Sequence, residues 1–122
     1  MATEPKHVRY GTPLGEWISL QPHRLLDNGS GLWNIVSAGD RGFGLSGAAL
    51  SDFVRRTILA LIDKGGRPVV ASETKPVWEE TFQYGTKPEE IADNVIAEWL
   101  SEGGNTEVEW GRWWFAYPGC HR

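Results

Sequence analysis

The sequence predicts an α+β protein, a two-layer sandwich in which two helices cover one face of a mostly antiparallel sheet. Two long segments repeat apolar residues at helical spacing, and shorter apolar or alternating segments lie between Gly- and Pro-rich turns. In chain order these elements run β-β-α-β-β-α-β, which is typical of helices packed on one layer of strands. A chain of 122 residues is long enough for one self-sufficient hydrophobic core, so residues 1–122 are predicted to form a single domain.

The N-terminal third is predicted to hold an irregular arm and two short strands. Residues 1–15 contain two prolines and two glycines, which interrupt regular structure and predict the arm. Residues 16–20 and 32–37 are short, largely apolar runs, and we interpret both as strands. Between them, the stretch Asp-Asn-Gly-Ser-Gly at 27–31 predicts a turn, because asparagine and glycine tolerate positive φ.

Two helices are predicted from longer periodic segments. Residues 47–64 carry apolar side chains at the i, i+3, i+4 and i+7 positions, and two glycines at 65–66 end the helix. The second helix is predicted over 87–102, before two further glycines. Thr86 and Glu89 have the spacing of a capping box at its start.

Three further strands are predicted at 67–73, 77–84 and 106–117, with 118–122 as a short tail. Alternation along the last strand places Trp110 and Trp114 on one face, which we expect to pack beneath the helices. The opposite face is more polar and is predicted to be an accessible interaction surface, formed by Trp113, Phe115, Tyr117, Glu107 and Glu109. The alternative is that the N-terminal arm around Trp17 covers this face.

A glycine-rich segment at 39–47 precedes the first helix, with four glycines in nine residues. Residues 42–47 match G-x-G-x-x-G, and the context partially resembles the first βαβ unit of Rossmann dehydrogenases, which implies dinucleotide binding. The later segments do not continue that fold, so the preferred interpretation is a sharp turn that packs Phe43 and Leu45 into the core. The alternative is a small-molecule, phosphate or nucleotide site formed by Arg41, Gly42, Gly44, Ser46 and Gly47.

The sequence contains no set of residues that predicts catalysis or a metal site. Residues 44–48 are similar to the G-x-S-x-G elbow of α/β-hydrolases, but Ala48 replaces the last glycine and the chain is short for that fold. Three histidines share no metal-ligand spacing: His7, His23 and His121. Glu107 and Glu109, about 7 Å apart on one strand face, could bind a hard cation or act as an acid/base pair, although solvated surface charge is favoured. We therefore expect no metal and no cofactor.

The charge of the chain is unevenly distributed. The net charge is −4, while residues 79–109 hold nine acidic residues and one lysine, which gives −8. Nucleic-acid binders need clustered Lys and Arg, so this acidic block argues against a nucleic-acid partner. It suits a basic protein partner or a solvated helix face. The absence of an 18-residue apolar run and of a signal peptide, together with a single cysteine, predicts no membrane span and a cytoplasmic location.

These features predict a small soluble binding or regulatory module rather than an enzyme. It would act through a protein-interaction surface formed by the aromatic last strand and the acidic segment 79–109. The alternative function is small-molecule, phosphate or nucleotide binding at the glycine-rich segment. The sequence leaves the oligomeric state open between a monomer and a weak dimer.

Overall fold

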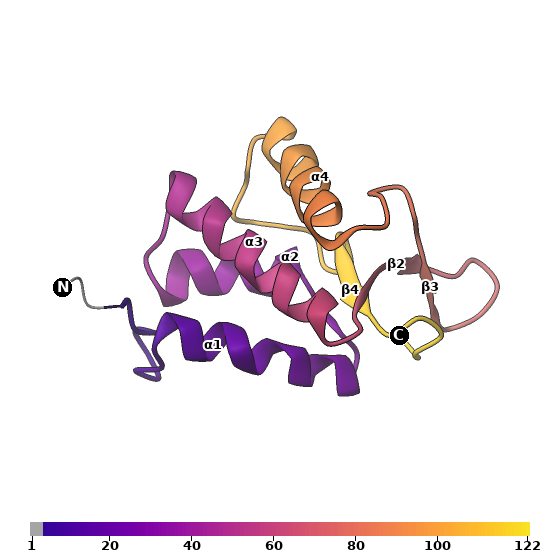
Figure 1. Cartoon of the computed structure of the whole chain (residues 1–122), viewed down its shortest axis with the longest axis horizontal. Coiled ribbons are helices and arrows are strands. Elements are labelled where there is room, and N and C mark those ends of the chain that lie inside the picture. Colours follow the sequence, from indigo (N-terminus) through magenta and orange to yellow (C-terminus); the bar gives the residue numbers. More distant parts are fainter. Residues whose placement is uncertain (1–3) are drawn as a thin grey trace.

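The computed structural model describes residues 4–122 and has the predicted α+β architecture (Figure 1). Four α-helices occur in this part of the chain: α1 (Leu14–Leu20), α2 (Leu32–Ser37), α3 (Gly47–Asp63) and α4 (Pro88–Ser101). Its four strands form one sheet: β1 (Ser30–Gly31), β2 (Arg67–Ala71), β3 (Trp78–Glu80) and β4 (Trp114–Ala116). A 3₁₀ segment, η1 (Gln21–Leu26), follows α1, and a π-helical turn, η2 (Ala38–Gly42), follows α2.

Helix α3 runs through the centre of the molecule and contacts α1, α2 and α4, as well as β4 (Figure 1). Its apolar residues face inward, and Phe53 and Val54 are almost completely buried. The helix ends where predicted, next to Gly65, whose φ of 98° suits glycine. The Gly66 N–H donates to the Leu61 carbonyl at 2.9 Å and closes the last turn. The main hydrophobic core therefore surrounds α3.

The prediction of strands at 16–20 and 32–37 is wrong, because these segments belong to helices α1 and α2. In α2 the buried residues Leu32, Ile35 and Val36 are spaced as one helix face, and this face packs against α3. A short apolar run fits either a buried strand or one face of a helix, so periodicity does not separate the two. Burial against α3 selects the helix.

All strand pairs are antiparallel, in the order β1-β4-β2-β3. Strand β4 is much shorter than the predicted 106–117. The residues before it form a loop, in which Gly111 and Trp113 have positive φ, 87° and 49°. After β4, the Cys120 carbonyl accepts a hydrogen bond from the Trp78 N–H at 2.8 Å, so the final residues lie beside β3.

The two faces of β4 are covered in the opposite way to the prediction. Phe115 is fully buried in the main core with residues of α3 and α4, and Trp113 joins the same core. Trp114 lies on the other face of the strand, in a second, smaller core with Trp78 and Val69. Trp114 is therefore buried as expected, but away from the helices.

Candidate ligand-binding site: the tryptophan pocket

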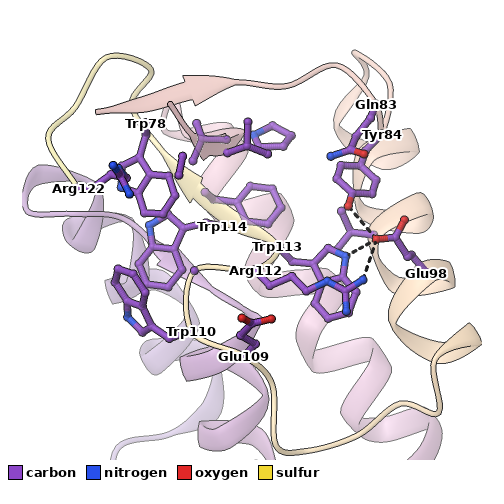
Figure 2. Close-up of a pocket in the computed structure, with 17 residues that line it drawn as sticks. Trp78, Gln83, Tyr84, Glu98, Glu109, Trp110, Arg112, Trp113, Trp114 and Arg122 are labelled. Carbon is purple, nitrogen blue, oxygen red and sulfur yellow. Dashed lines mark hydrogen bonds and ion pairs between the residues drawn. The ribbon is translucent and has the colours of Figure 1, made fainter. Parts of the chain in front are cut away.

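A hollow of about 580 Å³ opens at the start of β4, which is within the size range of small-molecule sites. Strand β4 begins with Trp114 opposite Val69, so Val70 and Ala71 of β2 extend beyond it without a β4 partner. The loop before β4 turns away at this point and leaves a notch. We call this hollow the tryptophan pocket; Trp78, Trp110 and Trp114 form one wall, and Tyr84, Glu98 and Arg112 form the other (Figure 2).

The indole wall is rigid. The rings of Trp78 and Trp114 stack with centroids 5.7 Å apart, and Trp110 lies 5.0 Å from Trp114. Asn28 holds both inner rings, because its side-chain oxygen accepts from Trp78 Nε1 at 3.0 Å and its carbonyl accepts from Trp114 Nε1 at 2.7 Å. Trp110, which was predicted to pack beneath the helices, is instead 50% exposed and is the outer member of the cluster. A half-exposed ring fixed from behind is preorganised for contact with a ligand.

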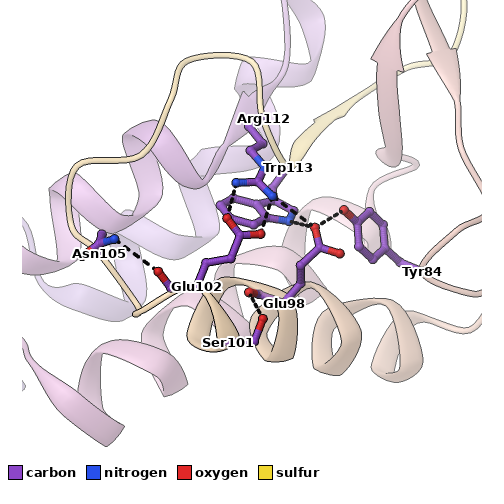
Figure 3. Close-up of polar contacts among 7 residues, drawn as sticks. All are labelled: Tyr84, Glu98, Ser101, Glu102, Asn105, Arg112 and Trp113. Carbon is purple, nitrogen blue, oxygen red and sulfur yellow. Dashed lines mark hydrogen bonds and ion pairs between the residues drawn. The ribbon is translucent and has the colours of Figure 1, made fainter.

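The polar wall is organised by Glu98 of α4 (Figure 3). One of its carboxylate oxygens, Oε1, accepts hydrogen bonds from the Tyr84 hydroxyl and from Trp113 Nε1, both at 3.0 Å. The Arg112 guanidinium lies 3.6 Å from the same oxygen and 4.0 Å from the centroid of the Trp113 ring. Arg112 also forms a two-pronged ion pair with Glu102. This network fixes the orientation of the guanidinium at the edge of the pocket.

The protonation states of this wall suit binding at neutral pH. Burial, followed by the hydrogen bond to Glu98 and the charge of that carboxylate, raises the pKa of Tyr84 from 10.0 to about 12. The hydrogen bond from Arg112 lowers the pKa of Glu102, and the same bond raises the pKa of Arg112. Tyr84 is therefore a neutral donor, far from the pKa that a general acid or base requires near pH 7.

The charges of the pocket lining are balanced. Two carboxylates, Glu98 and Glu109, and two guanidinium groups, Arg112 and Arg122, line the hollow. Gln83 adds an amide that both donates and accepts hydrogen bonds. A strongly charged ligand would meet as much repulsion as attraction here, so the lining favours a ligand of low net charge.

The predicted interaction surface does not form as one accessible face. Trp113 and Phe115 line the tryptophan pocket but are only 8% and 0% exposed, because α3 and α4 cover them. Glu109 also lines the tryptophan pocket and Glu107 does not, although Glu107, Glu109 and Trp113 together line a smaller hollow of about 190 Å³. The Tyr117 hydroxyl donates to the Lys64 carbonyl at 3.4 Å. The prediction that Trp113 and Phe115 are accessible is wrong. The prediction of a solvent-exposed strand face rested on Glu107 and Glu109, but both residues lie in the loop before β4 and not on the strand.

The glycine-rich segment is shaped by turn geometry and packing. Gly44 and Gly47 have φ of 67° and 56°, which favour glycine. A Cβ at Gly39 would lie within 3 Å of Leu50 and Phe53 side-chain atoms.

The residues proposed for an anion site in this segment are divided. Arg41 and Gly42 line a second hollow, of about 620 Å³, whereas Gly44, Ser46 and Gly47 line neither that hollow nor the tryptophan pocket. Ser46 occupies the N-cap position of α3 without a capping hydrogen bond from its side chain. Anion binding by this segment as a whole stays a prediction.

Sequence reasoning did not identify Tyr84, Glu98 and Arg112 as members of one site. The sequence did contain a pattern that could have identified Glu98, because this residue follows Ile91 by seven positions and Val95 by three. That spacing places a carboxylate at the edge of the apolar face of α4. An acid in that position needs polar partners from another element. The identities of those partners depend on the fold.

Comparison with families of known proteins, with curated proteins and with solved structures finds no match for this chain. Within residues 4–122 no helix is long and apolar enough to cross a bilayer. The same residues contain no group of three or more His, Cys, Asp or Glu side chains arranged to hold a metal ion.

Proposed function

We propose that the protein is a binding module, not an enzyme, whose tryptophan pocket takes a small, hydroxyl-rich molecule with one apolar face, the chemistry of a sugar. One observation carries this proposal. The half-exposed Trp110 ring, backed by two buried indoles, lies across a hollow of about 580 Å³ from the Glu98–Arg112 pair (Figure 2).

The two walls match the two sides of such a ligand. An aromatic ring buries the apolar C–H face of a sugar, and Trp110 offers the most exposed ring of the cluster. Sugar hydroxyls both donate and accept hydrogen bonds, which Glu98, Arg112 and Gln83 can satisfy. The balanced charge of the lining supports a neutral ligand. The free thiol of Cys120 is consistent with the cytoplasm, the location that we propose.

The proposal is tested by titrating a panel of neutral mono- and disaccharides against the ¹H–¹⁵N spectrum, including the indole N–H signals. We expect saturable shifts at the Trp110 indole and at the amides of residues 109–113. Trp110→Ala should abolish them. Trp33→Ala is the matched control, because Trp33 is 48% exposed but lies outside this pocket. Absence of saturation across the panel, or sugar binding that survives Trp110→Ala, would reject the proposal.

A protein partner is the second candidate function, and it retains the predicted role of the acidic segment. It is favoured by exposed apolar groups at the pocket, Trp110 at 50% and Val70 at 42%, close to the carboxylate of Glu109. A photo-crosslinking amino acid at position 110 distinguishes the two functions. A protein adduct of defined mass that forms with the probe at position 110, but not with the probe at position 33, would favour the protein-partner function, provided that no sugar binds.

A further inference from the structure

A second hollow, of about 620 Å³, lies apart from the tryptophan pocket, between the N-terminal segment 7–10, η1, α2, η2 and the loop 106–108. Three arginines from different parts of the chain line it: Arg9, Arg24 and Arg41. We call this the arginine hollow. The aromatic side chains of Tyr10, Trp17 and Trp33 also line it.

Among residues 4–122, the positive charge of the arginine hollow is only partly balanced by its lining. Within residues 4–122, every ion pair of an arginine involves Arg55 or Arg112, neither of which lines this hollow. Glu107 is the single carboxylate in the lining, against three guanidinium groups. Three like charges around one concavity create a positive potential, in a chain whose net charge is −4. An anion seated there would relieve that repulsion.

The N-terminal part of the arginine hollow is held in place. The backbone N–H groups of Arg9 and Tyr10 donate to His7 Nδ1 at 3.1 and 3.3 Å, which fixes the turn. The Val8 N–H donates to the Gly42 carbonyl at 2.8 Å and anchors this turn to η2. A Cβ on Gly42 would lie 2.6 Å from the His7 ring, so the glycine permits this close approach.

The exposed groups define a ligand with two kinds of chemistry. Guanidinium groups are planar forks that bind phosphate oxygens in pairs, and Arg24 is oriented by a 2.9 Å hydrogen bond from its Nε to Gln21. Trp33, 48% exposed, offers a ring face for stacking, whereas the Tyr10 ring already stacks on His7 with centroids 4.9 Å apart and has the Arg9 guanidinium 5.5 Å from its centroid. We propose that the arginine hollow binds a small organic anion that carries both a phosphate group and a planar ring. This site goes beyond the proposed sugar-binding function and does not depend on it.

Four probes separate the two parts of the ligand: AMP, adenosine, ribose 5-phosphate and inorganic phosphate. Calorimetry and amide shifts measure the binding of each to the full chain. We expect AMP to saturate, with shifts at Arg9, Arg41 and the Trp33 indole. Each of the three partial probes should bind at least about tenfold more weakly, as expected when a charge-assisted hydrogen bond or a stacked ring is lost.

Single substitutions locate the site. Arg41→Ala and Trp33→Ala should each weaken AMP binding about tenfold or more. Arg24→Lys keeps the charge but removes the fork, and it should also weaken binding. Arg56→Ala is the control, because Arg56 is exposed on α3 outside the hollow, and Trp110→Ala should likewise leave AMP binding unchanged. Thermal melts confirm that each variant is folded.

Three results would overturn the proposal: AMP fails to saturate, AMP binds equally well after Arg41→Ala and Trp33→Ala, or a partial probe binds as tightly as AMP. Sugar binding is mapped independently through Trp110, so the failure of one site is distinguishable from the failure of the other.

Discussion

Tyr84 links the protonation of the polar wall to the stability of the fold. Its pKa is about 12 in the folded protein, against 10.0 for an ordinary tyrosine, because burial and Glu98 disfavour the phenolate. The folded state holds this proton more tightly than the unfolded chain does. The stabilisation is therefore complete below pH 10 and is lost as the pH rises from 10 to 12.

Tyr84→Phe isolates this contribution, because the variant lacks the titrating group and its hydrogen bond to Glu98. We expect the variant to be less stable by about 1–2 kcal/mol at neutral pH. The difference in free energy of unfolding between the two proteins should shrink between pH 10 and pH 12. Urea unfolding at a series of pH values measures it. A constant difference across that window would contradict the assignment.

The three tryptophans of residues 110–114 should differ sharply in their contributions to stability. Trp113, just before β4, is buried in the main core, and Trp114, at the start of β4, is buried in the smaller core, so alanine at either position should cost about 3–5 kcal/mol. Trp110 is half exposed, and Trp110→Ala should cost about 1 kcal/mol. Urea denaturation followed by far-UV circular dichroism measures all three. If Trp113→Ala is tolerated, Trp113 is not a core residue, and the accessible surface predicted from the sequence would be supported at this position.

At the scale of elements, the start of α4 differs from the predicted capping box by one residue. The helix begins at Pro88 with Lys87 as its N-cap, and no side chain caps it. Instead, Glu90 Oε1 accepts a hydrogen bond from the Thr86 N–H at 2.9 Å. Glu90 therefore fixes the approach of the chain to the helix, while Glu89 contributes only its charge near the positive end of the helix dipole.

This difference predicts unequal effects of two neighbouring substitutions. Glu90→Ala should lower the free energy of unfolding by about 1 kcal/mol, because it removes both the hydrogen bond and the dipole interaction. Glu89→Ala should lower it by about 0.3–0.5 kcal/mol. Thermal and urea unfolding of both variants provides the comparison. Equal losses would show that the hydrogen bond to Thr86 contributes little.

At the scale of the whole molecule, the two hollows differ in charge. The tryptophan pocket has two carboxylates and two guanidinium groups in its lining, while the arginine hollow has one carboxylate and three guanidinium groups. Salt screens interactions between exposed charges beyond about 10 Å at 0.1 M ionic strength. The affinity of the arginine hollow for AMP should therefore fall as sodium chloride is raised, whereas sugar binding at Trp110 should stay constant. Calorimetry at low and high salt tests both, and equal salt dependence would contradict the separation.

The sequence by itself determined the α+β class, helices α3 and α4, the glycine stop after α3 and the strand β2. These elements carry signals that are local and strong, such as several turns of apolar periodicity or a pair of glycines directly after them. The sequence also predicted that Trp113 and Glu109 belong to an accessible interaction surface; both line the tryptophan pocket, but Trp113 is buried.

Only the tertiary structure decided the rest. The N-terminal runs became helices because α3 offered them an apolar surface, although as isolated runs they fit a strand equally well. Alternation along β4 separates Trp114 from Phe115, but it does not say which face meets the helices, and Trp113 lies in the loop before the strand. The Glu98 network joins residues 14 and 15 positions away in sequence, Tyr84 and Trp113, and it exists only because α4 packs beside the start of β4. Burial and polar pairing depend on which elements meet, and that is a property of the folded chain rather than of any local pattern.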